Sequence, residues 1–382
     1  MSKLERLIQQ YCPDGVEWKP LGECCNILDG KRKPITKGAR QSGPYPYYGA
    51  NGIQDWVANY IFDGTYVLIG EDGSVITPNG TPVVNWAQGK IWVNNHAHII
   101  AEKTGVLLRF LFYYIQIIDI HNLVHGNIPK LTQGDLKELE IPVPPLPVQE
   151  EIVRILDAFT ELQAELQAEL QKRQQQYNFY RDNLLNFNRG GQEIKWMKLK
   201  EIGKVCMCKR ILKEQTVSSG DVPFYKIGTF GGVADAYISQ ELFDSYKSKF
   251  SYPQKGDILI SAAGTIGRTV EFDGKPAYFQ DSNIVWLKHD ESIVLNSYLK
   301  YCYTLNPWAI STGGTIARLY NDNILNATIP VPPIAEQQKI VAILDRFDTL
   351  TNDLTSGLPA EMEKRRQQYE YYRDRLLTFK RL

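Results

Sequence analysis

Two short segments hold residue types that could act on DNA, but neither has the spacing that the chemistry needs. Pro13-Asp14 and Glu17-x-Lys19 resemble a compressed form of the acidic motif that holds the metal ion of many nucleases. In a working nuclease the two parts lie on separate strands that converge on the metal, so we interpret this stretch as a turn before a strand. Residues 306–309 approach the motif of amino-methyltransferases, but its second proline and following aromatic residue are missing.

Glycine-rich motifs for nucleotides and cofactors are absent as well. No G-x-G-x-x-G follows an expected strand to hold S-adenosylmethionine, and no G-x4-G-K-[ST] is present to hold ATP. We therefore predict a non-catalytic protein that binds no cofactor.

Histidines and cysteines give no convincing metal site. His96-x-His98 and His121-x3-His125 could each supply two imidazoles, but no acidic or cysteine residue lies at a suitable spacing in the sequence. Cys24-Cys25 and Cys206-x-Cys208 do not match the C-x2-C spacing of structural zinc sites. A four-cysteine site spread over two domains remains an alternative to the simpler interpretation, which is reduced and partly buried thiols. We predict no metal.

Composition indicates a soluble globular protein of two to three domains. The 382 residues include 43 Lys+Arg and 43 Asp+Glu, with 43% hydrophobic and 23% charged residues, which excludes a largely disordered chain. No run of 18 apolar residues could span a membrane, and the first twelve residues lack the apolar core of a signal peptide. We expect a cytoplasmic protein without membrane contact.

The dominant feature of the sequence is an internal duplication. The segment IPVPPLPVQEEIVRILDAF (141–159) returns as IPVPPIAEQQKIVAILDRF (329–347), and KRQQQYNFYRDNLLNF (172–187) returns as KRRQQYEYYRDRLLTF (364–379). The upstream regions are alike more faintly. Variable and similar regions thus alternate along the chain. The variable regions should therefore share a fold but recognise different targets.

The similar regions predict long paired helices. No Pro or Gly interrupts residues 148–189, and apolar residues recur with a heptad-like spacing, so we expect one helix of about 40 residues and about 60 Å. The second copy has four extra residues within TNDLTSGLPAEME, a stretch that carries Gly357 and Pro359, which predicts a break near 356–359. Because each apolar stripe is narrow, we expect the two arms to form an antiparallel coiled coil. The alternative is that each helix packs on its own domain.

The variable regions favour an α+β fold with irregular β-sheets. Short Val-, Ile- and Tyr-rich runs are separated by turn residues, and a few helices are expected. We therefore divide the chain into two globular domains and two helical arms: 1–147 and 190–335, and 148–189 and 336–382 respectively.

Basic clusters recur at matching places in the two variable regions. Lys31-Arg32-Lys33 follows the first expected strand, and Lys209-Arg210 follows its counterpart. Such loops could bind phosphates through Lys and Arg while other side chains read base edges. A solvated turn is the alternative for any single Lys-Arg pair, but the recurrence favours binding. No expected domain is strongly basic, which argues against a purely electrostatic nucleic-acid binder.

At family level the chain resembles the DNA-specificity subunit of type I restriction–modification systems. The resemblance covers essentially the whole chain and is carried by Gly-x-Ile-x-x-Leu, IPVPP, a Gln/Glu pair and Ile-x-x-Ile-Leu-Asp, which occur in order at 126–157 and 314–345. The first copy departs slightly, with Val148-Gln149-Glu150 in place of the usual Glu-Gln.

This resemblance implies two target-recognition domains related by a pseudo-two-fold and joined by a two-helix spacer. It implies that each domain reads one half of an asymmetric, two-part site in double-stranded DNA. It also implies two partner modification subunits, which methylate adenine with S-adenosylmethionine, and an ATP-dependent restriction subunit that translocates and cleaves DNA. Two alternatives remain: a coiled-coil adaptor whose variable domains bind protein, and an enzyme with an unrecognised site.

The spacer would act as a ruler, because its length would set the distance between half-sites, near one helical turn of about 34–36 Å. Candidate DNA contacts are basic, amide, hydroxyl and aromatic residues in the loops and Gly-rich segments of both domains. They are Lys31, Arg32, Lys33, Arg40, Tyr47, Asn51 and Asn127 in the first domain, and Lys209, Arg210, Lys213, Lys226, Thr229, Thr265, Arg268 and Thr315 in the second.

Overall fold

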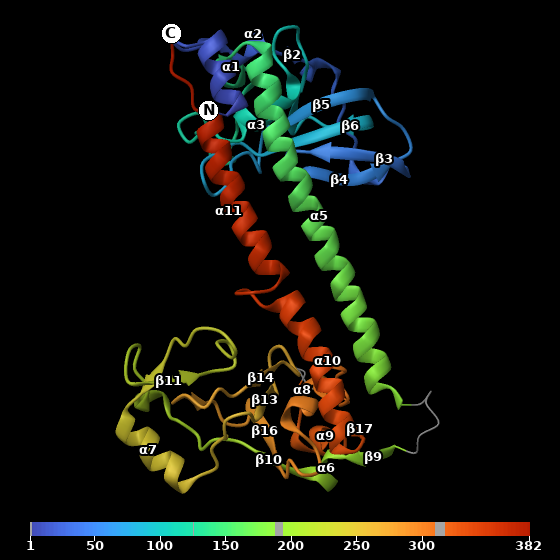
Figure 1. The fold of residues 1–382 in the computed structure, drawn as a ribbon, viewed down its shortest axis with the longest axis vertical. Helices are drawn as coiled ribbons and strands as arrows, with labels where there is room; N and C mark the ends of the chain where they lie inside the picture. The colour runs from blue at the N-terminus through green and yellow to red at the C-terminus, as the bar shows by residue number, and fades with distance from the viewer. Residues whose placement is uncertain (1, 125, 188–193, 310–317) are drawn as a thin grey trace. The chain divides into compact units, whose positions relative to one another are not determined.

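The computed structural model describes residues 2–124, 126–187, 194–309 and 318–382. The chain divides into two compact units, here called unit 1 (Met1–Gln167 with Glu361–Leu382) and unit 2 (Ala168–Ala360). Both units contain helices and strands (Figure 1). The predicted α+β class is therefore confirmed.

Unit 1 is built on a six-stranded sheet. Its order is β2-β7-β5-β6-β3-β4, in which β3 and β6 run parallel and the other neighbours are antiparallel. The apolar run at the end of β5 is fully buried in the sheet, with Val67, Leu68 and Ile69 at 0% exposure. The strands are β2 (Asn26–Ile27), β3 (Ser42–Gly49), β4 (Gly52–Val57), β5 (Phe62–Gly70), β6 (Val84–Val93) and β7 (Ala97–Ala101).

A second, two-stranded sheet of unit 1 lies at the base of the long helix. It pairs β1 (Glu17–Pro20) with β8 (Glu140–Val143), the strand formed by the first IPVPP segment. The apolar helix α3 (Leu108–Ile115) shares one core with the first turns of the long helix, where Ile152 and Leu156 are fully buried. The remaining short elements are α1 (Lys3–Tyr11), α2 (Leu21–Cys24), η1 (Asp29–Lys31), η2 (Lys37–Ala39) and α4 (Gln133–Lys137).

Unit 2 repeats this plan with shorter strands. Its sheets have the orders β10-β16-β13-β14, β12-β11-β15 and β17-β9. The strands are β9 (Lys195–Lys198), β10 (Gly203–Cys206), β11 (Val222–Tyr225), β12 (Tyr237–Ile238), β13 (Ile258–Ser261), β14 (Thr269–Glu271), β15 (Tyr278–Phe279), β16 (Ile284–His289) and β17 (Thr328–Val331). The helices are α6 (Leu199–Ile202), η4 (Lys213–Gln215), α7 (Gln240–Lys249), α8 (Asn296–Thr304) and α9 (Asn321–Leu325).

Strand pairing confirms the duplication that the sequence indicated. Trp18 pairs with Pro142 in unit 1, and Trp196 pairs with Pro330 in unit 2. The parallel strand pair β3–β6 of unit 1 likewise has a parallel counterpart in β11–β15. The faint similarity of the variable regions therefore reflects a shared backbone.

The long helices follow the prediction closely. Helix α5 (Leu146–Leu185) is continuous over 40 residues, whereas the second arm is divided into α10 (Ile334–Asn352) and α11 (Leu358–Leu376). The break starts a few residues before the expected position. A Cβ at Gly357 would lie 2.4 Å from the carbonyl oxygen of Thr349, so glycine permits this close turn.

Aromatic contacts within each unit pair the arms in antiparallel fashion. In unit 1, Phe159 of α5 stacks on Tyr372 of α11 with ring centroids 5.6 Å apart. In unit 2, Tyr180 of α5 stacks on Phe347 of α10 at 5.3 Å. The early part of α5 thus pairs with the late part of the second arm, and its late part with the early part. This pairing favours the coiled coil over helices that pack on their own domains alone.

A buried glutamine fixes the base of each arm to its unit. Gln149 accepts a hydrogen bond from the Leu107 amide at 2.9 Å and donates to the carbonyls of Gly105 and Pro144 at 3.1 and 2.7 Å. Gln337 repeats all three bonds with the amide of Leu295 and the carbonyls of Ile293 and Pro332. Because each amide is fully satisfied, it orients the helix start without leaving a buried polar group unpaired.

Candidate nucleic-acid interface

The basic loop of unit 1 divides its three cations between solvent and interior. Lys31 ends η1 and Lys33 follows it, and both side chains are exposed. Arg32 between them turns inward, with a side chain only 12% exposed that forms an ion pair with Glu71 and donates to the Ala97 carbonyl at 2.7 Å. Arg32 therefore holds the loop in place, and its role as a DNA contact stays a prediction.

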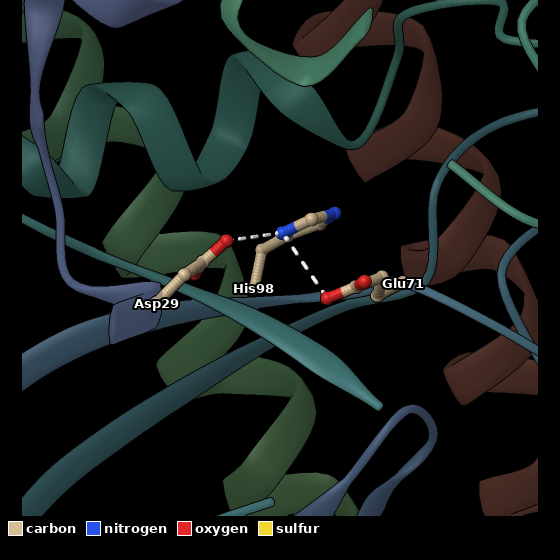
Figure 2. Close-up of side chains that lie close together, drawn as sticks. All are labelled: Asp29, Glu71 and His98. Atoms are coloured by element: carbon tan, nitrogen blue, oxygen red, sulfur yellow. Dashed lines mark hydrogen bonds and ion pairs between the residues drawn. The ribbon is translucent and has the colours of Figure 1, made fainter. Parts of the chain in front are cut away.

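Arg32 joins a buried network that includes Asp29, Glu71 and His98, the three side chains drawn in Figure 2. His98 contacts Asp29 through Nδ1 at 2.7 Å and the Leu131 carbonyl through Nε2 at 2.9 Å. Both ring nitrogens of His98 are therefore engaged by oxygen atoms of the protein. Burial alone would raise the pKa of Asp29, but its hydrogen bonds from His98 and the Ile99 amide hold that pKa below its usual value.

The same acidic residues could hold a metal by distance alone. Ligand atoms of Asp29, Glu71 and His98 lie within 4.8 Å of one another. The site is already balanced, because Arg32 pairs with both acids and Lys130 lies 3.3 Å from Glu71. A metal would also require neutral His98, so we interpret the cluster as an ion network and not as a metal site. These acidic residues are remote from His98 in sequence, and the sequence spacing therefore missed them.

The other paired histidine of the sequence does not extend this cluster. His121 contacts Asp119 at 2.9 Å in an exposed position, and His125 lies outside the described residues. The cysteines are all buried and free, and burial raises the pKa of Cys25 and Cys208 to about 12. These thiols fit the simpler interpretation of the sequence, which is reduced and buried cysteines.

Arg40 and Tyr47 stabilise the β3–β4 hairpin from within. Tyr47 is buried and its hydroxyl accepts a hydrogen bond from the Ile35 amide at 3.0 Å. Arg40 lies over the Tyr47 ring at 4.2 Å and pairs with Asp55 at 3.2 Å. Both are positioning residues in this structure, whereas Asn51 at the tip of the hairpin is exposed. Direct DNA contacts by Arg40 and Tyr47 stay a prediction.

The corresponding loop of unit 2 presents its arginine to solvent. Arg210 has a side chain that is 67% exposed and pairs with Asp281 at 2.9 Å. Lys226 pairs with Asp235 at 2.8 Å, and the Thr229 hydroxyl fixes the turn after β11 by contacts with the Lys226 backbone. Lys209 and Lys213 are exposed.

Three of these predicted residues meet at one cavity of about 570 Å³. The sequence analysis missed three more cationic or amide residues at the same cavity. The cationic and amide side chains that line it are Arg210, Lys213, Lys226, Gln280, Asn283 and Arg318. One signal was available for Arg318, which directly precedes the leucine of the second Gly-x-Ile-x-x-Leu motif.

The remaining candidates lie elsewhere on their units. Thr265 and Arg268 belong to the β13–β14 hairpin, where Arg268 donates to the Gly231 carbonyl at 3.1 Å. Asn127 is exposed in the segment between α3 and α4. Thr315 lies outside the described residues.

Comparison with known proteins identifies the family. A model described as the type I restriction modification DNA specificity domain matches residues 13–173 and again residues 192–364. The chain belongs to this family. The two matches coincide with the two copies of the duplication, so each copy is one DNA specificity domain.

Relatives of the specificity-subunit family match over their full lengths. A putative type I restriction enzyme specificity subunit of Haemophilus influenzae is 53% identical and covers 98% of both chains. The specificity subunit of an Escherichia coli type I restriction enzyme is 31% identical over 99% of this chain and 97% of its own. The fold is similar to a crystal structure of the S subunit from M. genitalium, with a TM-score of 0.60, 16% identity and coverage of 96% and 97%.

These findings confirm the family and the non-catalytic role that the sequence analysis predicted. Specificity subunits recognise DNA within a restriction–modification complex, and the curated relatives are named as such subunits. Across the described ranges, no helix is long and apolar enough to cross a membrane.

Proposed function

We propose that this specificity subunit recognises an asymmetric, two-part site in double-stranded DNA, with one half read by each recognition domain. The proposal assigns recognition to residues 1–147 and 190–335, and the spacer role to residues 148–189 and 336–382. The observation that carries it is the duplication itself: two domains share strand pairings but differ in the side chains of their loops. A shared scaffold with different loops is suited to two different half-sites.

The proposed DNA contacts are the exposed candidates, because a contact must reach a phosphate or a base edge. Arg32, Arg40 and Tyr47 support the loops, and Thr229 fixes a turn. The exposed set is Lys31, Lys33, Asn51, Asn127, Lys209, Arg210, Lys213, Thr265 and Arg268, with the half-exposed Lys226 beside it. We expect the lysines to bind phosphates, so their loss should weaken all DNA sequences alike.

The partners that we propose are two modification subunits, joined by the restriction subunit. Both arms carry an exposed aromatic pair at the same place in the repeat, Phe179-Tyr180 and Tyr371-Tyr372. Phe179 is 65% exposed and Tyr371 is 60% exposed, so both rings are open to contact with a partner. A surface that occurs twice would bind two copies of one partner.

The methylome of cells that express the full chain with its modification subunit tests this function. We expect one new two-part motif with methylated adenines, and no such motif without this chain. If the complex assembles but directs no new methylation, the recognition function is contradicted and a protein-binding adaptor would be favoured.

The aromatic pairs are tested in the same system. Changing Phe179 and Tyr371 to Ser together should reduce co-purification of the modification subunit, whereas either change alone should leave about one copy bound. Unchanged co-purification of the double variant would contradict this docking surface.

A further inference from the structure

Arg318 and Lys213 are the two cations lining the unit 2 cavity that form no ion pair with the described residues. Arg210 is paired with Asp281 and Lys226 with Asp235. Arg318 donates one hydrogen bond, from Nη2 to the Ser282 carbonyl at 2.7 Å, and forms no ion pair with any residue of the described ranges. Its charge and its other N–H groups are therefore available to a ligand.

The equivalent position in unit 1 shows what Arg318 lacks. The amide of Leu131 donates to the Glu71 carbonyl, and the amide of Leu319 donates to the Ala262 carbonyl, both at 2.9 Å. Lys130 and Arg318 precede these leucines and so occupy one position of the shared backbone. Lys130 lies 3.3 Å from the Glu71 carboxylate, but alanine replaces that acid in unit 2. The cation is retained in unit 2 while its internal partner is lost.

Two amides lie beside Arg318 on the same cavity. Gln280 accepts a hydrogen bond from the Ile227 amide at 2.9 Å, which fixes its side chain and leaves its NH₂ group as a donor. Asn283 is half-buried, and its side chain makes no hydrogen bond to the residues that the structure describes. Fixed and unpaired polar groups of this kind are suited to reading base edges.

The backbone between these amides adopts an uncommon conformation. Ser282 has φ of 53°, in the left-handed region that non-glycine residues rarely occupy. Its carbonyl is the group that Arg318 holds. Strained positions of this kind concentrate at functional sites, where surrounding contacts maintain them.

We infer that Arg318, together with Gln280 and Asn283, determines the base specificity of unit 2, with Arg318 reading a guanine in the major groove. An arginine guanidinium matches the O6 and N7 acceptors of guanine, while glutamine and asparagine match adenine. Lys213 and Lys226 on the same cavity would bind the flanking phosphates. This inference rests on the proposed function, because it assigns a base-reading role within one half-site.

Methylomes of cells with the modification subunit and Arg318→Ala, Arg318→Lys or Lys130→Ala chains test it. We expect Arg318→Ala to accept other bases at one guanine position of one half-site, with discrimination reduced roughly 5- to 150-fold and the other half-site unchanged. Arg318→Lys should relax the same position, because a lysine keeps the charge but cannot form the two-pronged contact. Lys130→Ala is the matched control and should leave the motif intact.

Two results would overturn the inference. One is an unchanged motif in both Arg318 variants. The other is weaker methylation at every sequence with Arg318→Ala and full recovery with Arg318→Lys, which would identify a phosphate contact. Arg318→Lys keeps a donor for Ser282, so it remains informative if Arg318→Ala does not fold. A wild-type chain that directs no methylation would instead contradict the proposed function, and this inference with it.

Discussion

Unit 1 and unit 2 place an arginine at the same point of the same loop, but the two arginines face opposite surroundings. Arg32 is held inside unit 1, whereas Arg210 extends from unit 2 with most of its side chain exposed. The cause is a set of internal residues that are acidic or cationic in unit 1 and apolar in unit 2. In sequence register, Asp29, Glu71 and His98 correspond to Met207, Ala262 and Val285.

This difference shows how a duplicated scaffold can diverge without a change of fold. Strand pairings and the buried glutamines stay the same, while the charges beneath the loops decide which cations reach solvent. This difference also explains why the net charge of the chain does not indicate DNA binding. A cation that is paired internally contributes nothing to a binding surface. The shared parts and the divergent parts should therefore respond differently to mutation.

The largest effect on the recognised DNA motif should come from changing an arm, and the arms also differ in length between the two copies. Inserting four residues into α5 after Gln167 adds about one turn, or about 6 Å, and keeps the helix faces nearly in register. We expect methylation at the original site to be lost and a motif with the same half-sites but a different gap to appear. Methylome sequencing measures this, and an unchanged gap would contradict the ruler.

The ion network of unit 1 gives the next largest effect. Changing Asp29 to Ala removes the partner of His98 Nδ1 and one of the two carboxylates that pair with Arg32, so that Glu71 is the remaining counter-charge, which should cost about 3–5 kcal/mol of unfolding free energy. The equivalent change in unit 2, Met207→Ala, removes only apolar contacts and serves as the control. Urea denaturation compares the two, and equal losses would show that the network does not stabilise the unit 1 loop.

Local sequence signals predicted the parts of the fold that depend on local physics. The long helix followed from apolar periodicity and the absence of Pro and Gly, and the break in the second arm followed from Gly357 and Pro359. The order of the six-stranded sheet was not predictable, because it depends on pairings such as β2 with β7, which are remote in sequence.

The candidate site shows the same limit. Exposure of Lys31 and Lys33 was expected from a basic turn, but the inward turn of Arg32 depends on Glu71, which is 39 residues away. Arg318 was missed because it stands alone in sequence, outside any basic cluster. Aligning the two copies would have paired it with Lys130, but only the tertiary contact with Glu71 separates their roles.

The buried glutamines belong to the shared part, so they should give matched effects. Gln149→Ala and Gln337→Ala each remove three hydrogen bonds, of which the one to Pro144 or Pro332 is buried and the other two are part-buried. Each change should cost about 2–3 kcal/mol, and the two losses should agree within about 1 kcal/mol. Calorimetry of both variants tests this. A large difference between them would mean that the two arm bases are not energetically equivalent.

The smallest effect should be the pH-dependent contribution of one carboxyl of unit 1 that its counterpart in the second copy cannot make. Glu151 of α5 has a side chain only 2% exposed and lies 2.6 Å from Lys3 of α1 and 2.7 Å from Arg154. Its hydrogen bond from Arg154 is the main reason that its pKa falls from 4.5 to about 2. In the second copy of the repeat the corresponding residue is Lys339, which makes only an exposed pair with Glu336.

A carboxyl whose pKa is lowered on folding stabilises the folded state at pH values above its unfolded pKa. The contribution of Glu151 should therefore be complete above about pH 4.5 and disappear as the pH falls toward about 2. Both cationic partners are more than half exposed, so solvent screening should limit Glu151→Gln to about 1 kcal/mol at pH 7. Thermal unfolding of wild type and variant from pH 7 down to pH 3 measures the difference, with Lys339→Gln as the control. A Glu151→Gln loss that stays constant with pH would place the effect in packing and not in the ion pair.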